Sequence, residues 1–324
     1  MNDVKIIAEF CQNHNGDLDI LKSMVSAAAR AGATHGKIQM VYAENLVYRP
    51  QFETGLSIDS EISCIKRPYQ EEFDRLKKLE LTVDDCKSFI RVCVDEGLIP
   101  CITCFAREQI PILQELGFPV IKVASYDCGS YQLLREITER FSEVIVSTGA
   151  CFDEEIEYAT EILRNVKFSL LHCVTVYPTP LDSLHLARMN YLRRLCSFVG
   201  FSDHTLVDRD GIKAAKAALA LGANLIERHF TILPSDKTKD GPVSVNENQL
   251  REISQFAALE VHERRIRIEE EWPTWEQSIG LEKRALSHDE LLNRAYYKGR
   301  FASGNRSSGD KQFMINNWEE TPVG

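Results

Sequence analysis

The sequence has no apolar run as long as the about 18 residues that a membrane-spanning helix needs. Its first residues, MNDVK, lack the basic-then-apolar order of a secretory signal peptide. An excess of positive charge is missing too, because 38 Lys and Arg face 48 Asp and Glu, for a net charge of −10. Sequence-independent nucleic-acid binding depends on basic surface. We therefore expect a cytoplasmic protein that binds neither membranes nor nucleic acid, with room for a local basic pocket that takes a small anion.

Common cofactor and metalloprotease motifs are also absent. The residues after the first expected strand, Phe10 to Gly16, do not form the G-x-G-x-x-G turn that dinucleotide-binding folds usually carry there. Neither a G-x-x-x-x-G-K-[ST] phosphate loop nor an H-E-x-x-H zinc motif occurs. These absences argue against an open dinucleotide-binding sheet, a P-loop nucleotidase and a metalloprotease of that class.

Ten cysteines are present, and in a cytoplasmic setting we expect them to be reduced. Cys101 and Cys104 form a C-x-x-C pair, a spacing that can indicate zinc or redox chemistry. The surrounding IPCITCF is typical of a strand, on which positions i and i+3 point to opposite faces. We therefore interpret both as core or cavity-lining cysteines without zinc or redox chemistry.

The sequence does contain a regular alternation of short apolar strands and amphipathic helices. We expect strands at 4–9, 36–40, 98–105, 120–123, 144–147, 168–172, 198–202 and 224–229. We expect a helix after each strand. A long polar segment, which runs to about Leu81, separates the second strand from the helix that follows it. Such alternation indicates parallel strands, and eight units over about 260 residues match a closed (β/α)8 TIM barrel. We predict a barrel catalytic domain over residues 1–272 and a short C-terminal extension over 273–324.

Chemistry in such a barrel lies at the C-terminal ends of the strands. The polar residues at or just beyond those ends include Glu9, Lys37, Gln39, Lys122, Ser125, Ser147, Ser202, His204 and His229. Two lysines and several hydroxyls suit a small anion such as a phosphorylated carboxylate. A lysine within an apolar strand is hard to dismiss, because an unpaired buried charge is costly. Glu9 could serve only as a partner for one of these lysines.

His204 and His229 follow neighbouring strands, which lie about 5 Å apart. Their imidazoles could therefore share one divalent metal ion, and two imidazoles with carboxylate or water suit zinc, manganese or iron. Open positions on that ion would make it a Lewis acid toward a carbonyl. The alternative is that each histidine only makes structural hydrogen bonds.

These motifs together resemble the sialic acid synthase family, which comprises N-acetylneuraminate synthase and relatives that make other nonulosonic acids. The similarity spans about residues 4–250 and keeps the motifs in order. The matching stretches are IAE at 7–9, NHNG at 13–16, KIQ at 37–39, IKVAS at 121–125, STG at 147–149, LHC at 171–173, YPTP at 177–180, GFSDHT at 200–205 and ERHFT at 227–231.

The resemblance implies that phosphoenolpyruvate condenses with an open-chain sugar aldehyde, with water addition and loss of phosphate by C–O cleavage. It implies a divalent metal, Mn²⁺ or Mg²⁺, held by His204 and His229, which polarises the aldehyde oxygen. Glu9 then corresponds to a proton-transferring or water-orienting carboxylate, with Gln39 close to the reacting pair. The positions that would hold the phosphate and carboxylate are Lys37, Lys122, Ser125, Ser147 and Ser202.

The sequence also departs from the family. Its members usually carry a C-terminal antifreeze-like domain that brings an arginine to the partner subunit's sugar, and too little chain follows the expected barrel for that domain. Arg294, Arg300 or Arg306 could substitute. The family is dimeric, so a homodimer through the outer helices is a possible state.

Other departures fall on the side of the pocket where the family binds the sugar. Thr175 replaces an asparagine two residues before Tyr177, Asp127 replaces a glutamate, and the family's Gly-Pro-Asp loop reads GPV with Asp240 just before it. We infer that Tyr177, Thr175 and Asp127 contact the acceptor, an N-acylated hexosamine or related sugar, and that it differs from N-acetylmannosamine.

Two alternatives stay open. One is another metal-dependent pyruvate or phosphoenolpyruvate aldolase, or an octulosonate phosphate-type synthase, which would need a second basic cluster that is not evident in the sequence. The other is a non-catalytic sugar-binding barrel.

Overall fold

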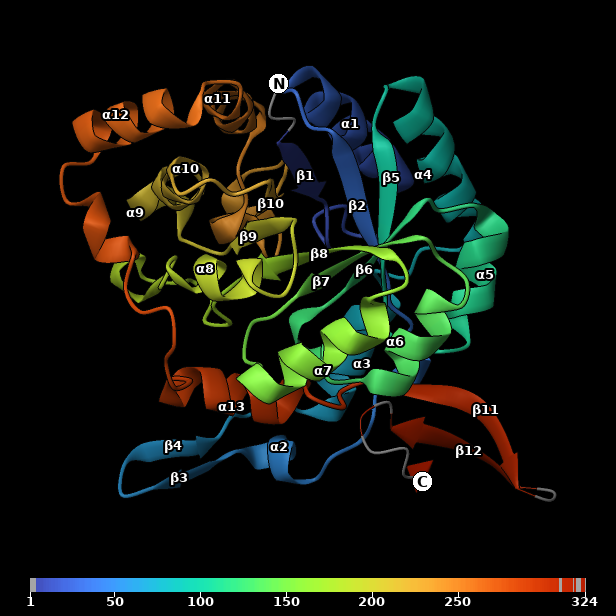
Figure 1. Ribbon diagram of the computed structural model, residues 1–324. Helices are drawn as coiled ribbons and strands as arrows, with labels where there is room; N and C mark the ends of the chain where they lie inside the picture. The colour runs from blue at the N-terminus through green and yellow to red at the C-terminus, as the bar shows by residue number, and fades with distance from the viewer. Residues whose placement is uncertain (1–3, 309–310, 317, 319–321, 324) are drawn as a thin grey trace.

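The computed structural model describes the backbone of residues 4–308, 311–316, 318 and 322–323. Within these residues, eight parallel strands close into a barrel, which confirms the predicted (β/α)8 fold (Figure 1). The barrel strands are β1 (Lys5–Glu9), β2 (His35–Met40), β5 (Ile99–Cys104), β6 (Val120–Val123), β7 (Glu143–Ser147), β8 (Lys167–His172), β9 (Val199–Asp203) and β10 (Leu225–His229). Around the barrel they follow in sequence order, and β10 closes the ring by pairing with β1.

Helices form the outer layer of the barrel. They are α1 (Leu18–Arg30), α4 (Val83–Asp95), α5 (Gln109–Leu116), α6 (Tyr131–Thr138), α7 (Asp153–Leu163), α8 (Arg188–Arg193), α9 (Val207–Asp210), α10 (Lys213–Ala220), α11 (Glu247–Ala257) and α12 (Val261–Glu271). Local signals set their starts. The Asp17 carboxylate accepts from two main-chain N–H groups of α1, and Thr82 forms a capping box with Asp85 at the start of α4. None of the helices within the described residues is long and apolar enough to cross a membrane.

The apolar core has an inner and an outer part. Side chains inside the barrel are Ile7, Cys101, Val120, Ile145, Leu171 and Leu225. The larger outer part lies between strands and helices and includes Cys104. The C-x-x-C pair therefore points to opposite faces of β5, and the packing interpretation is confirmed. All ten cysteines fall within the described residues, and each is a free thiol.

The excursion between β2 and α4 carries short elements that the sequence did not reveal. They are α2 (Gln51–Thr54), the β3 (Leu56–Ile58) and β4 (Glu61–Cys64) hairpin, and α3 (Tyr69–Lys77). Three of the four span no more than four residues, too few for a hydrophobic period to show. The structure also has short 3-10 segments: η1 (Ala43–Asn45), η2 (Ser125–Asp127), η3 (Leu181–Ser183), η4 (Ser235–Lys237), η5 (Gly241–Val243) and η6 (Trp275–Ser278).

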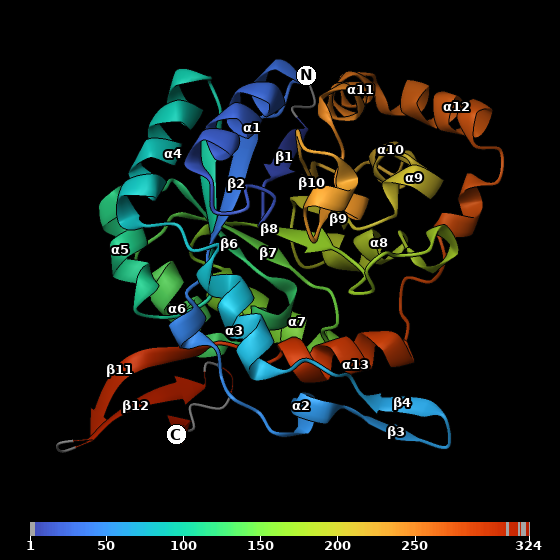
Figure 2. The same cartoon turned by 180° about the vertical axis from the view of Figure 1, so that it is seen from behind.

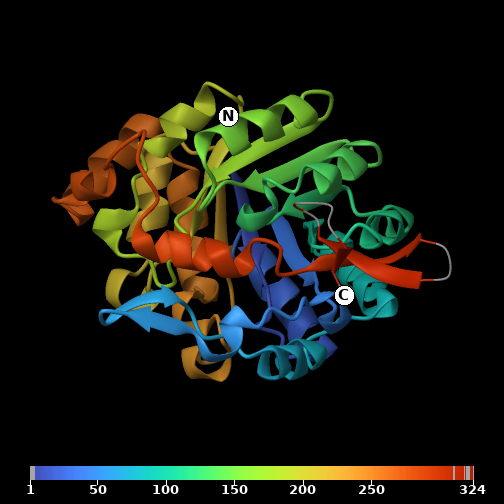
Figure 3. The same cartoon turned by 90° about the horizontal axis from the view of Figure 1, so that it is seen from below.

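The residues after 272 continue as α13 (His288–Tyr297) and the antiparallel strands β11 (Ala302–Ser308), β12 (Lys311–Asn316) and β13 (Pro322–Val323). Figures 1 and 2 show α13, β11 and β12 at the same end of the barrel as α2, α3 and the β3–β4 hairpin. Seen from below, α13 runs across that end beside the hairpin (Figure 3). Val47 N donates to Arg300 O at 2.9 Å, and Leu46 forms a β-bridge with Phe301. Two segments far apart in sequence therefore cover one end of the barrel together.

Candidate active site

A cavity of about 380 Å³ opens at the C-terminal ends of the barrel strands. It is bordered by strand ends from inside and by residues of α13 and the following loop from outside. Ten of the residues that the sequence predicted for the site line it, namely Glu9, Lys37, Gln39, Lys122, Ser125, Ser147, Tyr177, Ser202, His204 and His229. The structure therefore brings together residues from seven of the eight barrel strands or the loops that follow them.

Two predicted residues do not line the cavity. Thr175 is fully buried, and its main-chain oxygen accepts from Asn293 Nδ2 at 2.8 Å. Asp127 accepts from Ser130 Oγ at 3.0 Å, and burial raises the pKa of its carboxyl to about 7. Neither residue lines the cavity, whereas Asn293, which donates to Thr175, does line it.

The floor of the cavity is a buried cluster of opposite charges. Lys37 Nζ lies 3.6 Å from Glu227 Oε2, and Lys122 Nζ lies 3.7 Å from Glu227 Oε1. Ser202 Oγ donates to the same carboxylate at 2.7 Å. Burial disfavours the charged form of Glu227, yet Lys122 and Lys37 hold its pKa below the ordinary value, so it is an anion near neutral pH.

Glu227 was not among the site residues predicted from the sequence. It stands two positions before His229 on β10, and alternate residues of a strand face the same side. This two-residue spacing indicates that the Glu227 carboxylate points to the same side of β10 as the His229 ring.

The remaining contacts of the two lysines fix their ammonium groups. Lys37 touches the Glu9 carboxylate and donates to Thr103 Oγ1 at 3.1 Å, while Lys122 donates to Ser147 Oγ at 2.7 Å. Burial lowers the pKa of Lys37 to about 8. The other oxygen of Glu9 accepts from the main-chain N–H of Cys11 at 2.6 Å. Lys122 also donates to the main-chain oxygen of Val123 at 3.3 Å. Thr103 and Ser147 are neutral hydroxyl partners, which suit an incoming anion.

The two predicted histidines are neighbours. Their ring centroids lie 5.3 Å apart, and the Tyr177 hydroxyl lies 3.1 Å from His204 Nε2. Burial lowers the pKa of both rings, which favours the neutral imidazole that binds metals. The Nδ1 atoms of His204 and His229 are buried and have no hydrogen-bond partner among the described residues. Buried nitrogens of this kind need a ligand or water, so they fit a metal ion.

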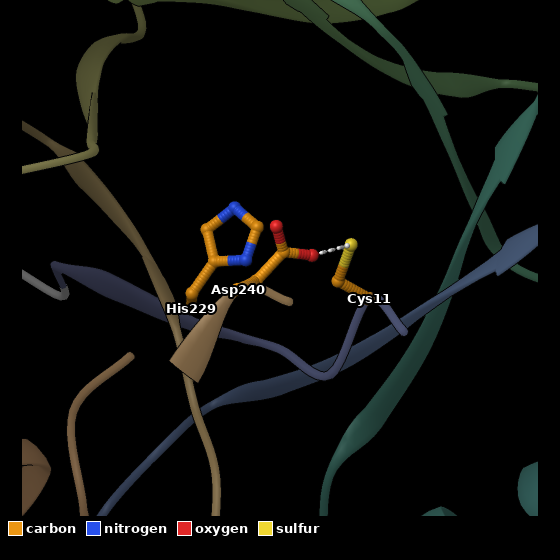
Figure 4. A group of neighbouring side chains, drawn as sticks. All are labelled: Cys11, His229 and Asp240. Carbon is orange, nitrogen blue, oxygen red and sulfur yellow. Dashed lines mark hydrogen bonds between the residues drawn. The ribbon is translucent and has the colours of Figure 1, made fainter. Parts of the chain in front are cut away.

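Two further ligand-type side chains lie next to His229 (Figure 4). Cys11 Sγ donates to Asp240 Oδ2 at 3.0 Å, and the ligand atoms of Cys11, His229 and Asp240 all lie within 4.8 Å of one another. His204 does not belong to this group. Cys11 was not among the residues singled out from the sequence, and Asp240 was noted only as the neighbour of the altered Gly-Pro-Asp loop. A sulfur, a nitrogen and a carboxylate oxygen form a donor set that suits divalent transition metals.

A second basic cluster lines the outer part of the cavity, where the sequence analysis found none. It consists of Arg67, Arg75, Lys239 and Arg300. Glu72 lies behind it and accepts two hydrogen bonds from Arg75, at 2.8 and 2.7 Å, and contacts Arg300. Arg67 and Arg75 belong to one segment around α3, whereas Lys239 and Arg300 are distant in sequence. No local sequence pattern therefore predicts the whole cluster.

The three tail arginines have different positions. Arg300 lines the cavity, whereas Arg294 binds Glu155 and the main-chain oxygen of Ala150. The side chain of Arg306 lies outside the described residues.

Counting all charged side chains that line the cavity gives six cations and three carboxylates. The cations are Lys37, Lys122, Arg67, Arg75, Lys239 and Arg300, and the carboxylates are Glu9, Glu227 and Asp240. The surplus of three positive charges contrasts with the whole chain, whose net charge is −10. Such a field concentrates small anions in the cavity.

Comparison with known proteins agrees with this geometry. The sequence model of the NeuB family matches residues 24–264. An uncharacterized protein of Methanocaldococcus jannaschii is 34% identical over 241 residues, which cover 73% of this chain and 64% of that protein. N,N'-diacetyllegionaminic acid synthase of Campylobacter jejuni is 33% identical over 256 residues, 75% of this chain and 71% of the enzyme. The crystal structure of N-acetylneuraminic acid synthetase from Leptospira borgpetersenii, in complex with citrate, has a TM-score of 0.67 at 26% identity and covers 90% of each chain.

Proposed function

The chain belongs to the NeuB family, and from that premise we propose that it condenses phosphoenolpyruvate with an open-chain sugar aldehyde. The product is a 3-deoxy-2-ulosonic acid of the sialic acid type, and inorganic phosphate is released. The observation that carries the proposal is the pair of buried lysines on either side of Glu227, at the floor of a cavity with surplus positive charge. The names of the similar proteins, which include legionaminic and pseudaminic acid synthases, support the reaction class.

The atoms balance as follows. The enol carbon of phosphoenolpyruvate attacks the aldehyde carbon, and the aldehyde oxygen takes up a proton. Water adds to the carbon that carries the phosphate, and the bond from that carbon to the bridging oxygen breaks. Phosphate therefore leaves with the bridging oxygen, and the new acid keeps the three carbons of the pyruvyl unit.

Lys37 and Lys122 hold the phosphate and carboxylate of phosphoenolpyruvate in this proposal. Ser125, Ser147 and Ser202 add neutral donors. Lys122 already donates to Ser147, and Ser202 to Glu227, so an entering anion exchanges existing contacts for charge-assisted ones. Glu227 raises the pKa of Lys37 against the effect of burial, and its negative charge lies near both lysine ammonium groups.

We assign Glu9 the role of taking a proton from the reacting water. One of its carboxylate oxygens contacts Lys37, and the Cys11 N–H holds the other in place, so it can take a proton from the water that adds to the former enol ester carbon. Gln39 lines the same part of the cavity, and its Nε2 lies 3.2 Å from Cys11 Sγ. We assign it a hydrogen bond to the reacting pair.

His204 and His229 would hold a divalent metal ion, whose contribution when bound is to polarise the aldehyde oxygen as a Lewis acid. Tyr177 orients His204 through its hydroxyl. The neutral state of both rings suits this role.

The outer basic cluster supports a more specific acceptor. Arg75, Lys239 and Arg300 line the cavity, and Glu72 compensates only part of their charge. This arrangement favours an acceptor that bears an anionic group, such as a sugar phosphate, and it gives the octulosonate phosphate-type alternative the second basic cluster it needs. A neutral N-acylated hexosamine is the other acceptor class.

Phosphate release from phosphoenolpyruvate with a panel of neutral and phosphorylated aldoses, in the presence of a divalent metal, tests the proposal. We expect release that depends on the acceptor, and a product heavier than the acceptor by one pyruvic acid unit. Metal-dependent binding of phosphoenolpyruvate without turnover of any acceptor would favour a sugar-binding barrel. Trapping of a pyruvate adduct by borohydride would favour a Schiff-base aldolase.

A further inference from the structure

The Cys11 thiol points at Asp240, beside the His229 ring, from a loop far away in sequence (Figure 4). Cys11 follows the end of β1, and Asp240 directly precedes η5. Their ligand atoms and those of His229 lie within 4.8 Å of one another, and all three side chains line the cavity. Closure of the barrel between β1 and β10 brings them together, because Glu9 pairs with His229.

The backbone of Cys11 is strained in a way that favours a function for its side chain. Its φ is +45°, in the left-handed region that residues with a Cβ rarely adopt. Glycine would occupy that conformation without strain. Strained positions of this kind cluster at sites where the surrounding structure holds a side chain for a purpose.

The nitrogen and sulfur atoms of this group make few other hydrogen bonds. His229 Nδ1 is buried without a hydrogen-bond partner among the described residues. Among the residues that the structure describes, the Cys11 sulfur has two hydrogen-bond partners, the Asp240 carboxylate and the Gln39 amide. A cation between sulfur, nitrogen and carboxylate oxygen would satisfy all three.

We propose that Cys11 and Asp240 join His229 in binding the divalent cation, through sulfur, oxygen and nitrogen, and that the thiolate makes the site prefer Zn²⁺, Fe²⁺ or Co²⁺ over Mg²⁺. The inference rests on the proposed function, because it concerns the cation of that same site. Thiolate is a soft ligand that selects such metals, whereas Mg²⁺ prefers oxygen ligands and keeps its water. When the cation binds, the Cys11 thiol releases its proton to the solvent.

Cobalt provides a direct readout, because a thiolate bound to Co²⁺ gives a charge-transfer absorption band in the near ultraviolet. The full-length chain is stripped with a chelator and titrated with Co²⁺, and calorimetry then compares Zn²⁺ with Mg²⁺. We expect the band in the unsubstituted protein and its loss in Cys11→Gly and Cys11→Ser. Zn²⁺ affinity should fall at least about tenfold in Cys11→Gly and in Asp240→Asn, with little change for Mg²⁺.

Matched controls separate ligand loss from misfolding. Cys11→Gly relieves the positive φ, so it should fold at least as well as the unsubstituted chain. Cys64→Ser removes a thiol on β4, and Asp236→Asn removes an exposed carboxylate in the same loop as Asp240. Both should keep the cobalt band.

Three results would overturn the inference: no cobalt binding, cobalt binding without a charge-transfer band, or a band that persists in Cys11→Gly. These outcomes are independent of turnover. If acceptor-dependent phosphate release occurs without the band, this inference fails and the proposed function stands. If the band appears and no acceptor reacts, the proposed function fails and this inference stands.

Discussion

Lys37 and Glu227 face each other across the inside of the barrel, with Nζ 3.6 Å from Oε2. Lys122 approaches the other carboxylate oxygen at 3.7 Å, so one buried anion serves two buried cations. A substrate anion that enters between the lysines meets charges that are already desolvated and held in place. The protein meets that desolvation cost when it folds.

Lys122→Ala should weaken phosphoenolpyruvate binding. Loss of one charge-assisted contact costs about 1.5–3 kcal/mol, or roughly a 10- to 150-fold rise in KM. Steady-state kinetics at saturating acceptor measures it. Lys22→Ala, which removes a surface lysine on α1, serves as the control and should leave KM unchanged. An unaltered KM in Lys122→Ala would remove this lysine from the anion site.

Activity should fall as pH rises through about 8. Burial lowers the pKa of Lys37 to about 8, and above that pH its ammonium loses the proton that attracts the substrate. The decline should appear in kcat/KM for phosphoenolpyruvate, which reports groups of the free enzyme. A profile that stays flat to pH 10 would show that Lys37 does not act as a cation.

Glu227→Gln tests whether the charge of Glu227 influences the pKa of Lys37. The Glu227 charge raises the pKa of Lys37 against the effect of burial, so its removal should shift the decline in kcat/KM to lower pH. A shift to higher pH would contradict the proposed coupling.

Arg300→Met should raise KM for an acceptor that bears a phosphate and leave KM for phosphoenolpyruvate unchanged. The guanidinium lines the outer part of the cavity, and loss of one charged contact costs about 1.5–3 kcal/mol. Arg294→Met is the matched control, because Arg294 binds Glu155 and does not line the cavity. Equal effects of both substitutions would assign Arg300 a structural role only.

Arg228→Met should destabilise the barrel by about 3–5 kcal/mol, because it leaves the Asp203 carboxylate buried without its partner. Both side chains are fully buried, and Arg228 also donates to the main-chain oxygen of Thr205 at 2.9 Å. The free energy of unfolding in urea measures the effect. A double substitution with Asp203→Leu should recover part of the loss, and no recovery would argue against the uncompensated charge as its cause.

Much of the fold follows from patterns that the sequence displays locally. Apolar strands and helix caps such as Asp17 and Thr82 recur at barrel spacing, and the rule that chemistry lies at strand ends led to Lys37, Lys122 and His229. These are properties of single elements and of their order, which a sequence shows directly.

The remaining features depend on tertiary closure. Cys11 meets Asp240 only because β1 pairs with β10, and Arg300 reaches the cavity only because its segment pairs with the loop at Val47. Thr175 was predicted from its place in a motif, yet it is fully buried and does not line the cavity. A homodimer stays a prediction.

The most direct test of the central claim is the fate of the bridging oxygen of phosphoenolpyruvate. Substrate labelled with ¹⁸O at that position is incubated with the protein, a divalent metal and the pooled aldoses, and the released phosphate is analysed by mass spectrometry. The account predicts that phosphate is released only with acceptor and carries the label, because the C–O bond breaks. Unlabelled phosphate, from cleavage of the P–O bond, or release that does not depend on acceptor would contradict it.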